Sequence, residues 1–279
     1  MTHKKSALIV GCGYVGSQLK KLLHSHNWDV TGIKRSKENG DKTTLSIDIK
    51  RKFSLKEKYD FVFYMISPNS RTEECYKEAF EKGVSNTLQA LKESLQKPSF
   101  IFVSSTSLFA ENSGKRVTES SAIETDSFSK KYLNIGEQLV KKSGLHFTVV
   151  RFSGIYGPNR YRLIDRLKDG TALLKKNPVI SNRIHLADCA GILCHLTTLK
   201  ERKTLYIASD SHPTPYNDVL IWLSKKLELD PPREEISSKS SRHMSNKICS
   251  NELLIQSGYT FIYPSFREGF LANKILMKC

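Results

Sequence analysis

The stretch that decides the fold is Gly11-Cys12-Gly13-Tyr14-Val15-Gly16. It follows a short apolar run, Ser6–Val10, and precedes an amphipathic stretch, Ser17–His26, with leucines on one face. A strand, a glycine-rich turn and a helix in this order form the setting in which G-x-G-x-x-G holds a dinucleotide. The first glycine permits the tight turn, the second lets the backbone approach a pyrophosphate, and the third lets helix and strand pack closely. The sequence therefore predicts a dinucleotide site, the alternative being a glycine turn that holds no ligand.

The residues after the second predicted strand, Trp28–Ile33, bear on the choice of dinucleotide. NAD-binding proteins usually place an acid there, which accepts hydrogen bonds from the ribose. This chain has Lys34, Arg35 and Ser36 and no acid. A guanidinium and a hydroxyl suit a 2′-phosphate, because they donate charge-assisted hydrogen bonds to it. We expect the cofactor to be NADP rather than NAD. The alternative is that Lys34 and Arg35 are surface charges and that the site accepts both.

Strands and helices continue to alternate through the first half of the chain. This alternation predicts an α/β fold, a Rossmann-type doubly wound parallel sheet with a small C-terminal substrate lobe. The expected dinucleotide-binding domain is residues 1–157 plus 184–209, and the expected lobe is residues 158–183 plus 210–279. The further elements of the first half are predicted as strands at Leu45–Asp48, Asp60–Ile66 and Phe100–Val103 and one long helix over Arg71–Gln96.

The second half of the chain carries weaker local patterns. Cys189–Leu199 has a helical pattern. Asp188 directly before it is expected to be the N-cap, because a side-chain oxygen there accepts a hydrogen bond from a free helix N–H. A polar loop is expected over Ser237–Ser245 and a terminal helix over Phe266–Met277.

The chain of 279 residues is basic, with 44 Lys and Arg against 28 Asp and Glu and a net charge of +16. The excess lies in two blocks, residues 1–60 with 13 basic and 6 acidic residues and residues 121–180 with 11 and 5. No basic run is longer than Lys50-Arg51-Lys52, and no nucleic-acid-binding motif accompanies the charge. We therefore expect a lysine-rich solvated surface and no nucleic-acid partner.

Six cysteines are scattered along the chain without a CxxC pair, so we expect no metal site. Scattered cysteines are typical of a reducing compartment. The apolar stretches fall short of the roughly 18 residues that a membrane-spanning helix needs, and the apolar run before Cys12 is too short for an export signal. These observations predict a cytoplasmic protein with no membrane partner. The expected assembly is a monomer or a homodimer.

Six further segments follow the glycine turn in a specific order. They are Lys82–Leu88 (KGVSNTL), Ser104–Ala110 (SSTSLFA), Arg151–Pro158 (RFSGIYGP), Asn182–Asp188 (NRIHLAD), Ser245–Lys247 (SNK) and Tyr263–Gly269 (YPSFREG). Together they resemble the extended short-chain dehydrogenase/reductase superfamily, its NAD-dependent epimerase/dehydratase group and, within that group, the atypical YeeZ-like proteins. The resemblance covers essentially the whole chain. It implies a dinucleotide cofactor and chemistry on a small-molecule substrate.

The resemblance also indicates candidate catalytic residues. It matches Ser105 to the family's catalytic Ser or Thr, whose hydroxyl hydrogen-bonds the reacting oxygen of the substrate. The family's proton donor is the Tyr of Y-x-x-x-K, but none of the 11 tyrosines here has a Lys four residues later. In the matching helix Ser129 replaces the Tyr and Leu133 replaces the Lys. Tyr132 is the nearby phenol, and Tyr156 is a third candidate.

The substrate side departs from the family pattern as well. Nucleotide-sugar members carry an Arg four residues before the His of the segment that includes His185, and that position is Ser181 here. Arg183 lies two residues on, on the same face of a strand, and is the candidate replacement. We expect His185 itself to make a structural hydrogen bond. A nucleotide-sugar substrate is therefore not supported by these residues.

Two functions stay open at this point. The first is an NADP-dependent oxidoreductase or epimerase of the epimerase/dehydratase type, acting on an unidentified small substrate that is anionic or sugar-like. The second is a dinucleotide-binding sensor or scaffold that has lost catalysis, suggested by the missing Tyr and Lys. The persisting substrate-lobe segments favour the enzyme. The expected cofactor-binding residues are Gly11, Gly13, Tyr14, Val15, Gly16, Arg35, Ser36, Asp48, Ile66 and Ser67.

Overall fold

The computed structural model of the chain describes residues 4–36, 41–236 and 245–272. The chain divides into two compact units, which we treat separately. Unit 1 comprises Met1–Leu108, Ile123–Arg151 and Ala190–Tyr206, and unit 2 comprises Phe109–Ala122, Phe152–Cys189 and Ile207–Cys279. The domain boundaries expected from the sequence stay a prediction.

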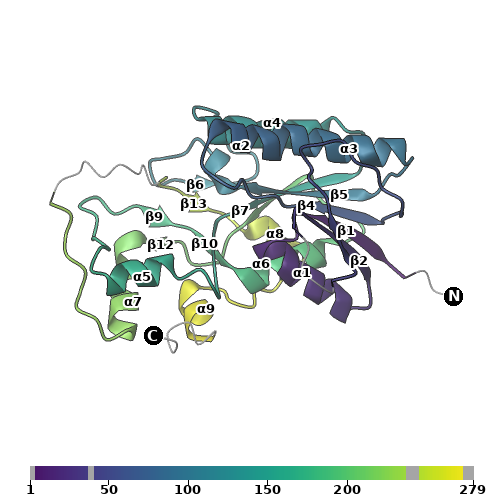
Figure 1. The fold of residues 1–279 in the computed structure, drawn as a ribbon. Helices are drawn as coiled ribbons and strands as arrows, with labels where there is room; N and C mark the ends of the chain where they lie inside the picture. The colour runs from purple at the N-terminus through teal and green to yellow at the C-terminus, as the bar shows by residue number, and fades with distance from the viewer. Residues whose placement is uncertain (1–3, 37–40, 237–244, 273–279) are drawn as a thin grey trace. The chain divides into compact units, whose positions relative to one another are not determined.

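A seven-stranded sheet in the order β11-β7-β5-β4-β1-β2-β3 forms the core of unit 1 (Figure 1). The pairs β1–β2, β1–β4, β2–β3 and β4–β5 are parallel. The strand order reverses between β1 and β4, so the predicted Rossmann-type doubly wound sheet is confirmed. The strands are β1 Ser6–Val10, β2 Asp29–Lys34, β3 Thr44–Ser46, β4 Phe61–Tyr64, β5 Ser99–Ser105, β7 Phe147–Phe152 and β11 Leu205–Ala208.

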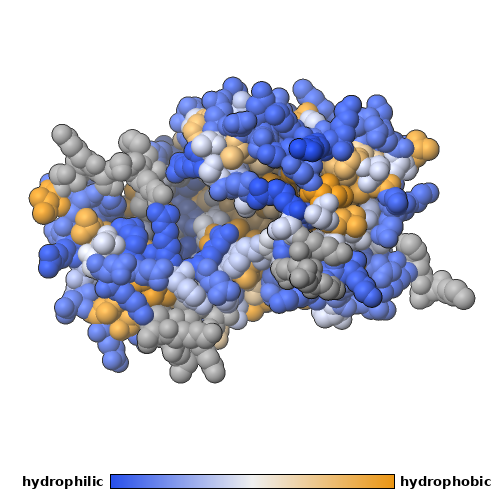
Figure 2. Space-filling model, viewed as in Figure 1, coloured by the Kyte–Doolittle hydropathy of each residue, from blue (hydrophilic) through white to orange (hydrophobic). Residues whose placement is uncertain are grey.

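Helices cover the sheet on both faces, which explains why residues 7–10 and 62–64 are fully buried. Helices α2, α3 and α4 pack together on one face, and α1 packs against β1 and β2 on the other (Figure 1). The outer surface of the α2–α4 layer is mostly hydrophilic (Figure 2). These helices are α1 Tyr14–Ser25, α2 Glu73–Lys77, α3 Gly83–Glu93 and α4 Phe128–Lys141.

The predicted single helix over Arg71–Gln96 is interrupted by a π-helical turn, Glu78–Lys82, between α2 and α3. The buried hydroxyl of Tyr64 on β4 donates a hydrogen bond to the carbonyl oxygen of Ala79 inside this turn. A Cβ added at Gly83 would lie 2.5 Å from the same hydroxyl. A side chain that competes for a helical carbonyl favours a local π-bulge, which gives a physical reason for the departure.

Unit 2 is built of short elements. Three two-stranded pairs, β8–β10, β9–β12 and β6–β13, accompany its helices. Helix α7 and helix α9 share an apolar core that includes Val219, Leu220 and Phe266. The elements are β6 Arg116–Val117, β8 Gly154–Tyr156, α5 Arg162–Lys168, β9 Ile180–Ser181, β10 Arg183–His185, β12 Thr214–Pro215, α7 Tyr216–Lys226, β13 Ile248–Cys249, α8 Glu252–Gln256 and α9 Phe266–Ala272.

The expectation that Asp188 caps a helix is wrong. Helix α6, Leu186–Leu196, begins two residues earlier, so Asp188 lies inside its first turn. Its carboxylate instead accepts hydrogen bonds from the Tyr259 hydroxyl at 2.9 Å and from the backbone N–H groups of Ile262 at 2.7 Å and Tyr263 at 3.0 Å. Asp188 therefore fixes the segment that precedes α9.

Two other expectations fall partly outside the described residues. They concern residues 237–244 of the predicted polar loop and residues 273–277 of the predicted terminal helix. Within the part of the chain that the structure describes, no helix combines the length and the apolar character needed to cross a membrane.

Candidate functional site

The glycine turn between β1 and α1 is closed tightly on one side. Gly11 has a φ of +97°, a conformation that side-chain-bearing residues rarely adopt. A Cβ added there would lie 2.9 Å from the backbone of Met65 and from the side chain of Ile66. The N–H groups of Gly11 and Cys12 both donate to the carbonyl oxygen of Ile33 at 3.1 Å. The turn therefore requires glycine at position 11 for both conformation and space.

The other side of the turn is open at Gly13. Gly13 is the N-cap of α1 and is exposed. A Cβ added to Gly13 would meet no atom within 4 Å. A Cβ at Gly16, by contrast, would lie 2.5 Å from the carbonyl oxygen of Gly11. Tyr14 and Val15, the first residues of α1, are partly exposed. This cradle fits a pyrophosphate, because a helix N-terminus directs N–H groups and the positive end of its dipole at an anion.

Arg35 and Ser36 lie directly after β2 and are both exposed. The Arg35 Nη2 donates to the Asn69 Oδ1 at 2.6 Å, and the Arg35 carbonyl accepts from the Ser46 hydroxyl at 2.8 Å. A guanidinium carries five N–H donors, and the contact with Asn69 occupies one of them. Arg35 is thus anchored by its backbone and one nitrogen, and this arrangement suits binding of an anion by the rest of the guanidinium.

The remaining predicted cofactor residues follow β3 and β4. Asp48 is partly exposed, and its Oδ1 accepts from the Lys50 N–H at 3.1 Å, so it begins a turn. Ile66 reaches the Gly11 backbone, while Ser67 after it is exposed. The structure therefore brings Ile66 and Gly11 together at the carboxyl ends of neighbouring strands, where open α/β sheets bind ligands. That all these residues contact a dinucleotide stays a prediction.

Ser105 is the last residue of β5 and is partly exposed. Its Oγ accepts a hydrogen bond from the N–H of Ser107 at 3.1 Å, at the start of a 3₁₀ turn, Thr106–Leu108. Within the described part of the chain, no acceptor takes the hydroxyl hydrogen of Ser105. The local backbone therefore orients Ser105 while its O–H can still donate to a ligand.

Sequence reasoning missed a buried network next to Ser105. Glu137 on α4 accepts hydrogen bonds from the Ser104 hydroxyl at 2.5 Å and from Arg151 on β7 through two nitrogens at 3.0 and 2.7 Å. The side chains of Arg151 and Glu137 are only 5% and 8% exposed. A bidentate buried pair of this kind fixes geometry, and here it ties α4 to β5 and β7. Arg151 opens the segment Arg151–Pro158, but its pairing with Glu137 cannot be predicted from the sequence, because it depends on how α4 packs against β7.

Tyr132 on α4 is buried, and its hydroxyl donates to the Glu73 carboxylate of α2 at 3.1 Å. Burial first, and then the Glu73 hydrogen bond and charge, raise the pKa of this phenol above its usual value of 10. Leu133, at the position of the family's Lys, lies in the apolar core. The ammonium of Lys131 lies over the ring at 5.3 Å from its centroid, but this side chain is more than half exposed. A phenol with a raised pKa is a poor proton donor or acceptor at neutral pH. Its catalytic role stays a prediction without support from the geometry.

Tyr156 belongs to the core of unit 2. Its hydroxyl donates to the Ser265 carbonyl at 3.3 Å, and its ring stacks on Phe270 at 4.9 Å between centroids. Burial raises the pKa of Tyr156, and the charges of Asp210 and Asp188 add to the effect. A Cβ added at Gly269 would overlap the Tyr156 hydroxyl. This packing explains why the segment YPSFREG ends on glycine and favours a structural role for Tyr156.

His185 makes the structural hydrogen bond expected of it. Its Nδ1 lies 3.1 Å from the Ala187 N–H, and its ring packs edge-on against Tyr156 and Tyr263 with centroids 5.2 and 4.3 Å away. Burial lowers the pKa of His185 to about 4. The imidazole is therefore neutral at physiological pH.

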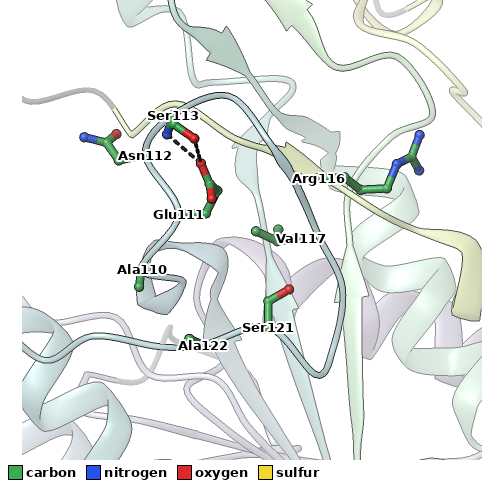
Figure 3. A pocket seen from close by; sticks show the side chains of 8 residues that line it. All are labelled: Ala110, Glu111, Asn112, Ser113, Arg116, Val117, Ser121 and Ala122. Carbon is green, nitrogen blue, oxygen red and sulfur yellow. Dashed lines mark hydrogen bonds between the residues drawn. The ribbon is translucent and has the colours of Figure 1, made fainter.

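The loop Phe109–Ala122 in unit 2 borders a cavity of about 530 Å³ (Figure 3). The Glu111 carboxylate accepts hydrogen bonds from the N–H and hydroxyl of Ser113 at 2.5 and 2.6 Å, which holds the loop in shape (Figure 3). The Asn246-Lys247 pair anchors the same loop, because Asn246 accepts from the Gly114 N–H and Lys247 donates to the Phe109 carbonyl. The cavity is lined by Ala110, Glu111, Asn112, Ser113, Arg116, Val117, Ser121 and Ala122.

No group of three or more His, Cys, Asp or Glu side chains suited to a metal occurs among residues 4–36, 41–236 and 245–272. The candidate groups at the turn are instead backbone N–H groups, hydroxyls and a guanidinium. These donors match a phosphate-bearing cofactor.

Comparisons with known proteins bear on the family and the fold of the chain. The chain is 26% identical to the protein YeeZ of Escherichia coli K12, over 93% of this chain and 97% of YeeZ. A structure described as a candidate NAD-dependent epimerase/dehydratase from Methylobacillus flagellatus is 26% identical and superposes with a TM-score of 0.80, covering 99% of this chain and 100% of that one. A human epimerase family protein with NADPH shares the fold at a TM-score of 0.79 and 15% identity, covering 96% of this chain and 98% of that one.

The sequence profile of one family spans more than half of the chain. It is described as the NAD dependent epimerase/dehydratase family, and the match covers residues 7–179, from β1 to the residue before β9. This range includes the glycine turn, Arg35 and Ser105. The chain therefore belongs to the NAD dependent epimerase/dehydratase family.

Proposed function

We propose that this protein is an NADP-dependent oxidoreductase or epimerase that acts on a small molecule. The observation that carries the proposal is the asymmetry of the glycine turn, which is closed at Gly11 and Gly16 and open at Gly13. A turn that only linked strand and helix would have no need of a side-chain-free position facing open space. A pyrophosphate placed there would lie at the N-terminus of α1, where the backbone N–H groups and the helix dipole favour an anion.

Arg35 supports NADP over NAD. Where NAD-binding members carry an acid, this chain places an exposed guanidinium that Asn69 holds from one side. An acid would repel a 2′-phosphate, whereas an arginine attracts it and donates to two of its oxygens.

The proposed chemistry relies on few protein groups. The nicotinamide, when bound, supplies or accepts the hydride. Ser105 donates its hydroxyl hydrogen to the reacting oxygen of the substrate, while the Ser107 N–H holds the Ser105 oxygen in place. Position 129 carries Ser and position 133 carries Leu, so the chain lacks the family's Tyr and Lys at the matching positions. Positioning of cofactor and substrate must then supply much of the rate.

A cofactor-bound crystal structure of the full chain tests the proposal. We expect the nicotinamide C4 beside an open pocket, with the Ser105 hydroxyl close enough to reach an oxygen on a carbon held roughly 3–3.5 Å from C4. An apolar, closed wall around C4 would contradict an enzymatic role. Loss of turnover in Ser105→Ala, with NADPH affinity retained, would support the role of this hydroxyl once a substrate is in hand.

A further inference from the structure

The amino edge of the seven-stranded sheet in unit 1 carries a row of lysines. Backbone hydrogen bonds run along this edge from strand to strand, as from the Asp29 N–H to the Lys5 carbonyl at 2.9 Å and from the Ser99 N–H to the Asp60 carbonyl at 2.9 Å. Neighbouring strands are about 4.8 Å apart, so the residues that lead into them lie side by side. An exposed lysine lies one to three residues before each of β1, β4, β5 and β11, and these residues are Lys5, Lys58, Lys97 and Lys203.

This edge as a whole has an excess of positive charge. The six segments that lead into β1, β2, β4, β5, β7 and β11 contain 11 Lys or Arg and five Asp or Glu. Lys58, Lys97 and Lys203 form no salt bridge within the described residues, so their charges remain available to an anionic partner. We call the six segments the basic edge, and they are residues 4–5, 26–29, 56–60, 92–98, 141–146 and 200–204.

One apolar side chain projects from the basic edge. Leu95 follows the C-cap of α3, has a φ of +53° and is 90% exposed. Its N–H donates to the Lys92 carbonyl at 3.1 Å, and the Gln96 N–H donates to the Leu91 carbonyl at 3.0 Å. Such a turn at a helix end usually has glycine at the left-handed position, because side chains disfavour this backbone conformation. A leucine there gains no packing at this exposure, so folding does not account for it.

Gln96 fixes the turn of Leu95 beside Lys58. The buried Gln96 side chain accepts from the Tyr59 N–H at 3.0 Å and donates to the Glu57 carbonyl at 2.8 Å. These two contacts bracket Lys58 in the segment before β4, and another exposed lysine follows Leu95 by two residues. The leucine therefore lies among lysine side chains on a turn that hydrogen bonds hold in place.

The pairing of amines with an aliphatic group narrows the kind of anionic partner. Nucleic acids are commonly bound by positive charge together with aromatic side chains on which bases stack. The tryptophan and the tyrosine of the basic edge, Trp28 and Tyr59, are each only 8% exposed, so they offer no stacking surface. An anionic lipid bilayer fits both groups, because its headgroups attract lysines and its acyl region accepts a leucine.

We propose that the basic edge of unit 1 is a peripheral docking surface for an anionic lipid bilayer. The row of lysines lies against the headgroups, and Leu95 enters the acyl region. The sequence predicts no membrane partner because no segment is long enough to span a bilayer, but a peripheral contact needs no such segment. The glycine turn and Arg35 follow the carboxyl ends of β1 and β2, at the opposite edge of the sheet, so docking leaves the proposed dinucleotide site open.

Vesicle co-sedimentation of the full chain tests the proposal. The probes are vesicles of phosphatidylcholine alone and mixed vesicles of phosphatidylcholine and phosphatidylserine at about 2:1, whose surface potential is negative. We expect binding to the mixed vesicles to exceed binding to phosphatidylcholine and to weaken as salt is raised, because salt screens the attraction. Equal sedimentation with both kinds of vesicle, or none with either, would overturn the proposal.

The double variant Lys58→Glu, Lys97→Glu separates the basic edge from the net charge of the chain. Loss of about fivefold in vesicle affinity for each lysine gives a loss of at least roughly 25-fold for the two. The matched control Arg51→Glu, Lys52→Glu makes the same change in net charge on two exposed residues after β3, at the opposite edge of the sheet. It should lose far less affinity. Equal losses in the two double variants would show that net charge alone drives binding and would overturn the proposal.

Leu95→Asn tests the apolar contact without disturbing the fold. Asparagine tolerates the left-handed backbone better than leucine does, so the Tm should be unchanged or higher. Binding to the mixed vesicles should fall about 10-fold or more, because the aliphatic group that enters the acyl region is gone. Unchanged vesicle binding in Leu95→Asn would overturn the proposal, and a lower Tm would in addition give this leucine a role in the fold.

A fluorescent single-stranded DNA oligonucleotide provides the alternative polyanion. At the salt concentration at which the mixed vesicles bind, we expect no saturable binding of the oligonucleotide. Saturable binding that Lys58→Glu, Lys97→Glu abolishes would assign the basic edge to nucleic acid and overturn the proposal. NADPH affinity should stay at the wild-type value in every variant of the basic edge, which keeps a failure of this proposal distinct from a failure of the proposed function.

Discussion

A Cβ at Gly16 would lie 2.5 Å from the carbonyl oxygen of Gly11, so α1 meets the glycine turn with no room for a side chain. Two residues from Gly11, at Gly13, the same turn faces open space. One glycine therefore serves packing and the other leaves room for a ligand. Substitution by alanine can separate these two roles.

Gly16→Ala should lower the free energy of unfolding by about 1–3 kcal/mol, because the new methyl group meets backbone that cannot yield easily. Gly13→Ala should change stability by no more than about 0.5 kcal/mol, yet weaken NADPH binding, because its methyl group occupies the space proposed for the pyrophosphate. Urea unfolding and calorimetry measure the two effects. Equal destabilisation by both variants, or wild-type affinity in Gly13→Ala, would argue against this division.

The buried Glu137–Arg151 pair should contribute strongly to stability when only one partner is removed. Arg151→Met leaves the Glu137 carboxylate buried with only the Ser104 hydroxyl, and a loss of roughly 3–5 kcal/mol is expected. The double variant Glu137→Met, Arg151→Met should recover much of that loss, because no unpaired charge remains. Urea unfolding of the single and double variants checks this, and additive losses would refute it.

Asp210 should make stability depend on pH. It is 2% exposed, and burial raises its pKa from 3.8 to about 7. The folded state therefore keeps a proton that the unfolded chain releases, so this residue lowers the free energy of unfolding as pH rises from about 4 to 7. The full effect is roughly 4 kcal/mol. Asp210→Asn should remove it, becoming more stable relative to wild type at pH 8 than at pH 4. A pH-independent difference would disprove the assignment.

His185 should make the stability of the protein depend on pH in the opposite direction. Burial lowers its pKa from 6.5 to about 4, so the unfolded chain binds a proton that the folded state does not. Stability is then lost as pH falls from about 6.5 to 4. His185→Gln should flatten this acid limb of the urea-unfolding profile, and an unaltered limb would contradict the assignment.

Tyr132→Phe should behave as a structural substitution. Removing the hydroxyl breaks its hydrogen bond to Glu73, and a loss of about 0.5–1.5 kcal/mol is expected. Because the hydroxyl is engaged with Glu73 rather than positioned as an acid, NADPH affinity should match that of the wild type. A large fall in affinity or turnover with unchanged stability would restore Tyr132 as a functional residue.

The features of the fold and of the candidate site that depend on local chemistry could be predicted from the sequence. The turn at Gly11 and the position of Arg35 after β2 follow from conformational and charge requirements within a few residues, and the parallel sheet follows from the alternation of elements. The π-turn at Glu78–Lys82 could not be predicted, since it depends on a hydroxyl from β4. The role of Asp188 depends in the same way on residues some 70 positions further on.

The buried Arg183 Nη1 and Asp210 Oδ2, which have no hydrogen-bond partner within the described residues, show the same limit of prediction from sequence. Each residue taken alone resembles an ordinary strand or loop position in the sequence. The fold brings the two residues together, because the Asp210 N–H donates to the Arg183 carbonyl oxygen, and it leaves one polar atom of each side chain without a hydrogen-bond partner. Tertiary structure alone reveals such a cluster.

Calorimetric comparison of NADPH with NADH tests the central claim most directly. We predict tighter binding of NADPH by the wild type. Arg35→Ala should lose about 1.5–3 kcal/mol for NADPH, roughly 10- to 150-fold in Kd, and leave NADH unchanged. Arg233→Ala serves as the matched control and should bind both as the wild type does. Equal affinity for the two dinucleotides, or no loss in Arg35→Ala, would contradict the account.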